Sequence, residues 1–219
     1  MAIAAPPKRS IEELVDYLGG IPRERIRMTP EPGRATVEDV VYLDVHEDRL
    51  CELIDGILVE KTVGLYESAL GYILGGLILN FVQKHKLGMV AGEAGMMRIL
   101  PNQVRIPDIS FISKERLANC NIRREPVPEI SPDLAVEILS ESNTKREMDR
   151  KLREYFEGGT RLVWYVDPES RTVSVYTSPE TMSVLSENDL LTGGEVLVGF
   201  QVRVGDVFDE ADESFEAGE

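Results

Sequence analysis

Two carboxylates interrupt segments that otherwise have the apolar character of buried strands. Asp108 lies within residues 105–112, and Glu137 lies within residues 134–139. An unpaired charge is costly to bury, so such carboxylates are normally paired or bound to a metal. One shared divalent cation with oxygen ligands, Mg²⁺ or Mn²⁺, would stabilise both and could activate a water against a phosphodiester. The alternative is that each carboxylate pairs with an arginine or with backbone N–H groups.

A charged amphipathic helix predicted after the second of these strands supplies positive groups. Glu147, Lys151 and Tyr155 recur every four residues and therefore share one face, and Lys145 lies near the helix start. A lysine that leans over the strand of Glu137 would orient an attacking water and steady the charge developing on phosphate. The alternative is an exposed Glu147–Lys151 pair on a solvated face.

Other chemistries have little support. His46 and His85 are the only histidines and lie far apart, so a histidine triad or a histidine-rich metal site is not expected. Cys51 and Cys120 match no zinc-ligand spacing and are expected to be reduced thiols. The sequence has no phosphate loop of the Walker type.

A β-hairpin and a long core helix are predicted ahead of the first carboxylate. Asp55-Gly56 separates two apolar strands and suits a type I′ turn, in which both central residues have positive φ. Apolar residues recur at helical spacing over 70–82, with Gly88 as the expected cap. The longest apolar run, 69–79, is shorter than the roughly 20 residues that span a bilayer, so we expect no membrane association.

The elements that would carry the site follow in the second half of the chain. The apolar segments 134–139 and 162–166 are predicted as parallel strands joined by the helix 145–157 in a right-handed crossover. Further strands are expected at 89–91, 96–100, 103–112, 171–176, around Val184 and at 196–200. This order predicts an α/β domain with a mixed sheet flanked by helices.

Charge and composition set limits on the class of protein. The 219 residues carry 24 basic and 39 acidic side chains, a net charge of −15. Strong acidity disfavours nonspecific nucleic-acid binding, but a locally neutral or positive face can still meet phosphates. The N-terminus has charge and prolines where a secretory signal would be apolar, so we expect a cytoplasmic protein.

The chain divides into three predicted parts. Residues 1–35 form an N-terminal helical appendage with a proline-rich connector, and residues 36–204 form the core. Residues 205–219 contain seven acidic and no basic side chains, and we expect a solvated acidic tail.

An ordered set of motifs carries a family resemblance. The motifs are Glu52-Leu53-Ile54-Asp55-Gly56, Pro107-Asp108, Val136-Glu137-Ile138-Leu139-Ser140, Lys151 with Tyr155, and Trp164-Tyr165-Val166-Asp167-Pro168. Together they resemble the bacterial Uma-type restriction endonucleases of the PD-(D/E)xK nuclease superfamily. The resemblance implies a restriction-endonuclease-like mixed sheet, Asp108 and Glu137 as metal ligands, and Mg²⁺- or Mn²⁺-dependent hydrolysis of DNA.

One position departs from the superfamily pattern. The superfamily lysine would fall two residues after Glu137, where this chain has Leu139. Lys151 matches this family's own lysine and is the expected replacement, with Lys145 as second choice. At the head of the long helix, where the family usually has a histidine, Glu67 is a candidate third ligand.

Some alternatives stay open at this point. A second Pro-Asp pair ends in Asp133, which begins a strand and is expected to have a turn or cap role rather than a ligand role. A nuclease-like fold does not guarantee cleavage, so the alternative function is a catalytically inactive nuclease-fold domain that binds DNA or a protein partner. The long helix contains Gly71, Gly75 and Gly76, which would suit a core contact or a homodimer contact equally.

Overall fold

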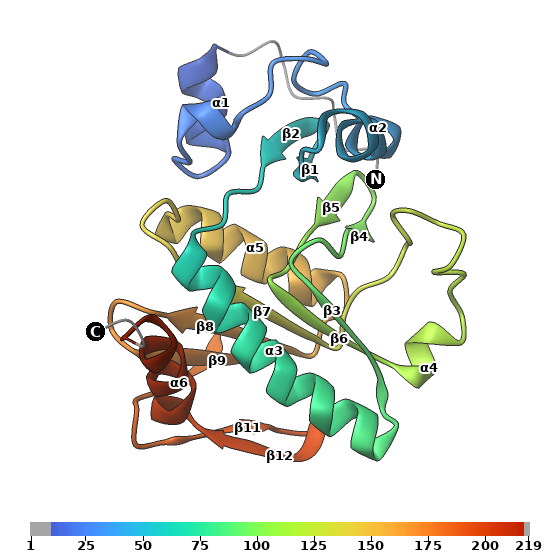
Figure 1. Cartoon of the computed structure of the whole chain (residues 1–219). Coiled ribbons are helices and arrows are strands. Elements are labelled where there is room, and N and C mark those ends of the chain that lie inside the picture. Colours follow the sequence, from blue (N-terminus) through green and yellow to red (C-terminus); the bar gives the residue numbers. More distant parts are fainter. Residues whose placement is uncertain (1–9, 217–219) are drawn as a thin grey trace.

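A mixed six-stranded sheet forms the centre of the computed structural model, which describes residues 10–216 (Figure 1). In the order in which they pair, its strands are β10 (Thr181–Leu185), β9 (Thr172–Ser178), β8 (Leu162–Asp167), β7 (Leu134–Ile138), β6 (Ile109–Ser113) and β3 (Gly88–Gly92). The helices on its faces are α3 (Leu65–His85), α5 (Lys145–Glu157) and α6 (Val204–Glu216). β7 and β8 are parallel and the other neighbours are antiparallel, so the predicted parallel pair joined by α5 is confirmed.

The two faces of this sheet carry different helices. Successive side chains of a strand point to opposite faces. Leu134 and Val136 of β7 pack in one cluster with α3 and α6, whereas Ala135 packs with the buried side chains of α5. Glu137 has the same parity as Ala135, and its carboxylate therefore lies on the α5 side.

Two smaller sheets and four short helical elements complete the described chain. A four-stranded sheet has the order β2 (Ile57–Glu60), β1 (Cys51–Ile54), β5 (Gln103–Arg105) and β4 (Met97–Leu100), and β11 (Leu190–Gly193) pairs with β12 (Leu197–Arg203). The helical elements are α1 (Ile11–Tyr17), η1 (Arg23–Arg25), α2 (Val37–Glu47) and α4 (Lys114–Leu117). Asp55 and Gly56 join β1 to β2 with φ of 50° and 77°, as the predicted hairpin turn requires. Cys51 and Cys120 are free thiols.

The segment 103–112, predicted as one strand, is divided between two sheets. Its first part is β5 of the four-stranded sheet, and its second part is β6 of the central sheet. Pro107 has no N–H to donate to a strand neighbour, and Asp108 follows it at the break. The backbone N–H of Asp108 donates to Val136 O at 3.1 Å, which attaches the chain to β7 immediately after the break.

α3 is longer than its uninterrupted apolar run. It ends at His85, and Lys86 rather than the expected Gly88 takes the left-handed conformation, with φ of 54°. Among the described residues it is the one helix long and apolar enough to cross a membrane by length and composition. Leu70, Leu74 and Ile78 on one of its faces are buried against the central sheet, as a core helix requires.

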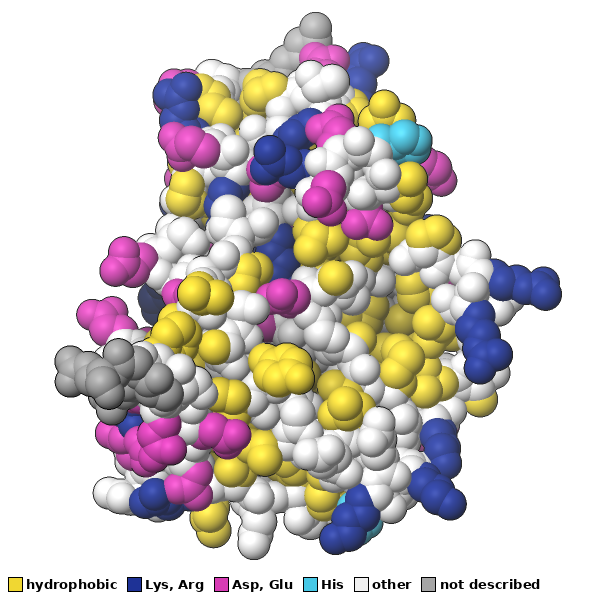
Figure 2. Space-filling model, viewed as in Figure 1, with side chains coloured by type: hydrophobic (Ala, Val, Ile, Leu, Met, Phe, Trp, Pro, Cys, Tyr) yellow, Lys and Arg dark blue, Asp and Glu magenta, His cyan; other side chains and the backbone are white. Residues whose placement is uncertain are grey.

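The acidic C-terminal stretch is a packed helix, so the prediction of a solvated tail is wrong. Val207, Phe208 and Ala211 of α6 are buried in the same cluster as α3. Acidic side chains gather at the lower left of Figure 2, over α6. Asp212 of α6 pairs with Arg171 at 2.5 Å. The charge run therefore conceals an amphipathic helix. The division into 1–35, 36–204 and 205–219 stays a prediction, and residues 1–9 and 217–219 lie outside the described range.

Candidate active site

Asp108 and Glu137 line one small cavity where β6 and β7 pair. Asp108 directly precedes β6, and its Oδ2 accepts a hydrogen bond from the Ile138 N–H at 2.7 Å. Glu137 lies within β7 and is 4% exposed. The cavity that both residues line has a volume of about 30 Å³, enough for about one water molecule or one dehydrated ion. The structure thus brings together the two carboxylates identified in the sequence.

Lys151 extends from α5 to Glu137. Its Nζ lies 3.0 Å from Glu137 Oε2 and 3.2 Å from Glu52 Oε1. Tyr155, one turn further along α5, donates its hydroxyl hydrogen bond to Glu137 Oε1. Glu147, Lys151 and Tyr155 are all buried, so the alternative of an exposed Glu147–Lys151 pair is wrong. The helix packs its charged face inward, against the face of the sheet that carries Glu137.

A second lysine, which sequence reasoning missed, serves Asp108. Lys61 follows β2, and its Nζ lies 2.8 Å from Asp108 Oδ1 and 2.7 Å from the carbonyl oxygen of Ile106. The Lys61 side chain is 8% exposed. Its only sequence signal is a lysine that follows Glu60 at the end of a hairpin strand, which is too common a pattern to identify a site residue.

Glu52, which also lines the cavity, belongs to a buried ionic network. Glu52 Oε2 lies 2.6 Å from Arg105 Nη1, and Arg105 also binds Glu154 of α5. Arg105 is 1% exposed, so both of its charge partners are needed to compensate its desolvation. The network fixes β1, β5 and α5 relative to one another and thereby orients the helix that carries Lys151.

The N-terminal segment also contributes a side chain to the cavity. Arg25 of η1 is 7% exposed, and its Nη1 lies 3.0 Å from Glu147 Oε1. Its Nε donates to the carbonyl oxygen of Glu60 at 3.0 Å. The N-terminal segment, expected from the sequence to be an appendage, thus supplies a buried arginine that lines the cavity.

Burial and neighbouring charges shift the ionisation of the central groups in different directions. Burial raises the pKa of Glu137, and Asp108 and Glu52 raise it further against the opposing effect of Lys151. Burial acts in the same direction on Glu52, but Lys151 and Arg105 outweigh it and lower its pKa to about 2. Burial tends to lower the pKa of Lys151, yet Glu137 and Glu52 raise it above its usual value. The ammonium of Lys151 is therefore charged throughout the physiological pH range.

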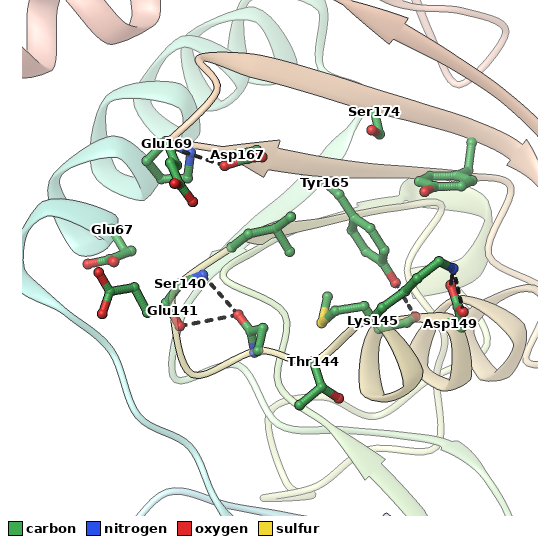
Figure 3. A pocket seen from close by; sticks show the side chains of 15 residues that line it. Glu67, Ser140, Glu141, Thr144, Lys145, Asp149, Tyr165, Asp167, Glu169 and Ser174 are labelled. Carbon is green, nitrogen blue, oxygen red and sulfur yellow. Dashed lines mark hydrogen bonds and ion pairs between the residues drawn. The ribbon is translucent and has the colours of Figure 1, made fainter. Parts of the chain in front are cut away.

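A larger open pocket lies beside the cavity and is drawn in Figure 3. Its volume is about 620 Å³, and Glu67, Ser140 and Asn143 line both spaces. Figure 3 shows Glu67 and Glu141 close together at one end of this pocket. At the other end, Lys145 Nζ binds Asp149 Oδ2 at 2.7 Å. The pocket gives solvent access beside the buried carboxylates.

The remaining sequence candidates occupy different places. Glu67 lies at the border of cavity and pocket, and its role as a third ligand stays a prediction. The Lys145 side chain is 86% exposed and, as described above, binds Asp149 rather than the central carboxylates. Asp133 accepts hydrogen bonds from the Ser113 N–H at 2.8 Å and from Arg116 Nε at 3.0 Å, the kind of loop-fixing role expected for it.

The donor set of the cavity fits a divalent cation in its chemistry. Carboxylate oxygens are the ligands that Mg²⁺ and Mn²⁺ prefer, and the cavity volume suits a single ion. Within residues 10–216, however, no three His, Cys, Asp or Glu side chains are already grouped to hold a metal. Lys61 and Lys151 neutralise Asp108 and Glu137 instead. A cation bound here would have to displace at least one of these ammonium groups from its carboxylate.

A mixed sheet that places two carboxylates and a lysine around one cavity defines the class as a nuclease-like α/β protein. The family model described as "Uma2: Putative restriction endonuclease" matches residues 37–205, and the chain belongs to this family. The matched region contains Asp108, Glu137 and Lys151 but begins after Arg25.

A solved structure has the same fold. It is described as a "putative nuclease belonging to DUF820" from Anabaena variabilis ATCC 29413, and it superposes on this chain with a TM-score of 0.65. The two sequences are 22% identical, and the similarity covers 75% of this chain and 92% of that chain. No curated protein matches this sequence.

Proposed function

We propose that this protein is a metal-dependent endonuclease that hydrolyses DNA phosphodiester bonds. The observation that carries the proposal is the Glu137–Lys151 ion pair at 3.0 Å, beside Asp108 in a cavity of the size of one ion. Family membership supports the same class of reaction. A Mg²⁺ or Mn²⁺ ion bound by Asp108 and Glu137 would supply an activated water and neutralise charge on the phosphate.

The protein's own groups have separable parts in this proposal. Lys151 keeps a positive charge next to Glu137, where it would orient the attacking water and stabilise charge developing on the phosphate. Tyr155 holds the second oxygen of Glu137 and fixes the carboxylate plane. The Ile138 N–H holds Asp108 Oδ2 in the same way. Both carboxylates are thus pre-oriented before a substrate arrives.

Nicking of supercoiled plasmid DNA tests the proposal. Wild-type protein should convert supercoiled to open-circular DNA with Mg²⁺ or Mn²⁺ and stop when EDTA is added. Lys151→Ala should reduce the rate by about 10² or more, the scale for loss of a positioned electrostatic group. Lys145→Ala on the same helix is the matched control and should retain the rate, because its side chain is exposed and bound to Asp149. A loss in Lys145→Ala with Lys151→Ala active would move the role to Lys145.

One observation favours a second candidate, an inactive nuclease-fold domain that binds DNA or a protein. Each central carboxylate already has a buried lysine partner, so the site is internally neutralised. Wild-type protein that binds DNA but nicks no plasmid, linear duplex or single-stranded DNA with either cation would establish this alternative.

A further inference from the structure

Lys61 is the cationic partner of Asp108 but is not one of the residues assigned a part in cleavage above. Its Nζ lies 2.8 Å from Asp108 Oδ1, and the other oxygen of Asp108 accepts the Ile138 N–H. Among the described residues, no other side-chain cation is within ion-pair distance of Asp108. Asp108 is therefore neutralised by Lys61, and Glu137 by Lys151.

The surroundings of Lys61 would let it give up this pairing. Besides Asp108, its Nζ donates to the carbonyl oxygens of Ile106 at 2.7 Å and Glu93 at 3.3 Å. The contact with Glu93 is on the exposed side of the residue. An ammonium has three protons to donate, so two backbone carbonyls and a water would satisfy it after the carboxylate is lost. Lys61 would then not become an unpaired buried charge.

Asp108 also differs from Asp133, an aspartate whose ion pairs only stabilise the fold. The Asp108 side chain is 13% exposed and lines the cavity together with Glu137. The Asp133 side chain is 3% exposed and is fixed by Ser113, Arg116 and Arg161, away from the cavity. An ion pair that only stabilises the fold does not need a cavity of the size of one ion beside it, whereas Asp108 lines such a cavity.

We propose that Lys61 is a built-in counter-cation that occupies Asp108 in the cation-free protein and competes with a divalent cation for that carboxylate. The inference rests on the proposed function in that Asp108 is taken as a metal ligand. A fixed positive charge a few ångströms from a cation site opposes binding by several times the thermal energy. Removing the charge of Lys61 should therefore strengthen divalent-cation binding. The loss of a residue that supports the cation site would weaken that binding instead.

Isothermal titration with Mn²⁺, in the absence of DNA, tests the competition. Lys61→Met preserves the length of the side chain without its charge and should bind Mn²⁺ at least tenfold more tightly than wild type. Lys145→Met is the matched control, and its affinity should stay within twofold of wild type because Lys145 is exposed and does not line the cavity. An equal or weaker affinity in Lys61→Met overturns the inference.

A second variant guards against misfolding of Lys61→Met. Lys61→Gln also removes the charge but keeps an N–H donor for the carbonyl oxygen of Ile106, and it should show the same tightening. Its thermal midpoint should lie below that of wild type in EDTA and rise more steeply with Mn²⁺, because a ligand that binds only the folded state stabilises it. A Mn²⁺-dependent rise no larger than that of wild type would overturn the inference.

The outcomes separate this inference from the proposed function. If Lys61→Met tightens Mn²⁺ binding while wild type nicks no DNA, the inference stands and the endonuclease proposal fails. If wild type nicks DNA but Lys61→Met and wild type bind Mn²⁺ equally, the endonuclease proposal stands and the inference about Lys61 fails. If Asp108→Ala binds Mn²⁺ as wild type does, Asp108 is not a ligand and the inference fails whatever the nicking result.

Discussion

Replacement of Lys151 by methionine should destabilise the fold strongly, in a way that depends on pH. Met has nearly the length of Lys, so the change removes the charge with little loss of volume. Glu137 and Glu52, which are 4% and 2% exposed, lose the ammonium at 3.0 and 3.2 Å. Glu52 keeps Arg105, but among the described residues Glu137 keeps only the Tyr155 hydroxyl as a side-chain partner. Breaking a buried ion pair from one side costs about 3–5 kcal/mol, and we expect a loss of this size in metal-free buffer.

The pH dependence follows from Glu137. Its pKa is already raised by burial, and removal of Lys151 should raise it further. A carboxyl whose pKa is higher in the folded than in the unfolded state destabilises the fold at pH values above that pKa. This penalty shrinks as the pH falls through the folded pKa, because the carboxyl takes up a proton. The variant should therefore lose less stability near about pH 5 than near about pH 8.

Urea unfolding followed by fluorescence of Trp164, the single tryptophan, measures this loss. Lys145→Met is the control and should change stability by less than about 0.5 kcal/mol, since its side chain is exposed. The double variant Glu137→Gln, Lys151→Met should recover part of the loss because no unpaired charge remains. A loss below about 1 kcal/mol, or an equal loss at both pH values, would refute the assignment of Lys151 and Glu137 as a tightly coupled buried pair.

Three further predictions concern other parts of the molecule. Phe208→Ala in α6 should cost about 3–5 kcal/mol in urea unfolding, whereas Phe215→Ala, at an exposed position of the same helix, should cost less than about 0.5 kcal/mol; equal losses would show that α6 is not part of the core. Asp108→Ala should weaken Mn²⁺ binding at least tenfold in titration calorimetry and leave the far-ultraviolet circular dichroism unchanged; unchanged affinity would remove it from the ligand set. The pKa of Glu52 is lowered to about 2 from 4.5, so its stabilisation is present above about pH 4.5 and is lost as the pH falls toward about 2. Acid titration of the unfolding free energy should show that slope in wild type and a flatter one in Glu52→Gln.

Much of the fold was predictable because periodicity and turn chemistry are local properties. Parallel β7 and β8 with α5 between them follow from two apolar segments and the charged amphipathic segment that separates them. The break at Pro107 was harder to predict, since residues 103–112 keep a strand-like pattern across a change of sheet. Which sheet each part joins depends on pairing with β1 and β7, which no local pattern specifies.

The acidic C-terminus illustrates a different limit. Seven acidic residues without a base favour a solvated segment on charge alone. Val204, Val207, Phe208 and Ala211 nevertheless recur at helical spacing and bury one face against α3. Arg171 offsets part of the charge on the other face by binding Asp209 and Asp212. Arg171 lies in the turn between β8 and β9, far from α6 in the sequence. The count of charges within residues 205–219 therefore could not predict that this segment packs on the core.

Long-range pairing also explains why only part of the site could be identified. Asp108, Glu137 and Lys151 stood out because a charge within an apolar or periodic context is unusual in itself. Lys61 and Arg25 did not, because nothing near them in the sequence marks them as buried. Their burial arises from the return of the chain past Ile106 and from the docking of η1 beside α5.

The position of Lys151 shows how the charge missing at Leu139 can be supplied from another element. Residues 137 and 139 share a face of the strand, so a lysine at 139 would have extended along the surface that α5 covers. Here Leu139 packs into the apolar cluster beneath α5, and the helix itself brings the ammonium to Glu137 at 3.0 Å. The lysine stem reaches from backbone to carboxylate in either arrangement. α5 is held in place by two ion pairs, Arg105 with Glu154 and Arg25 with Glu147. The position of the Lys151 ammonium therefore depends on the buried ionic network rather than on the strand. Replacing Leu139 by lysine in a Lys151→Met background would therefore restore the charge but not its orientation, and we expect it to recover stability only in part.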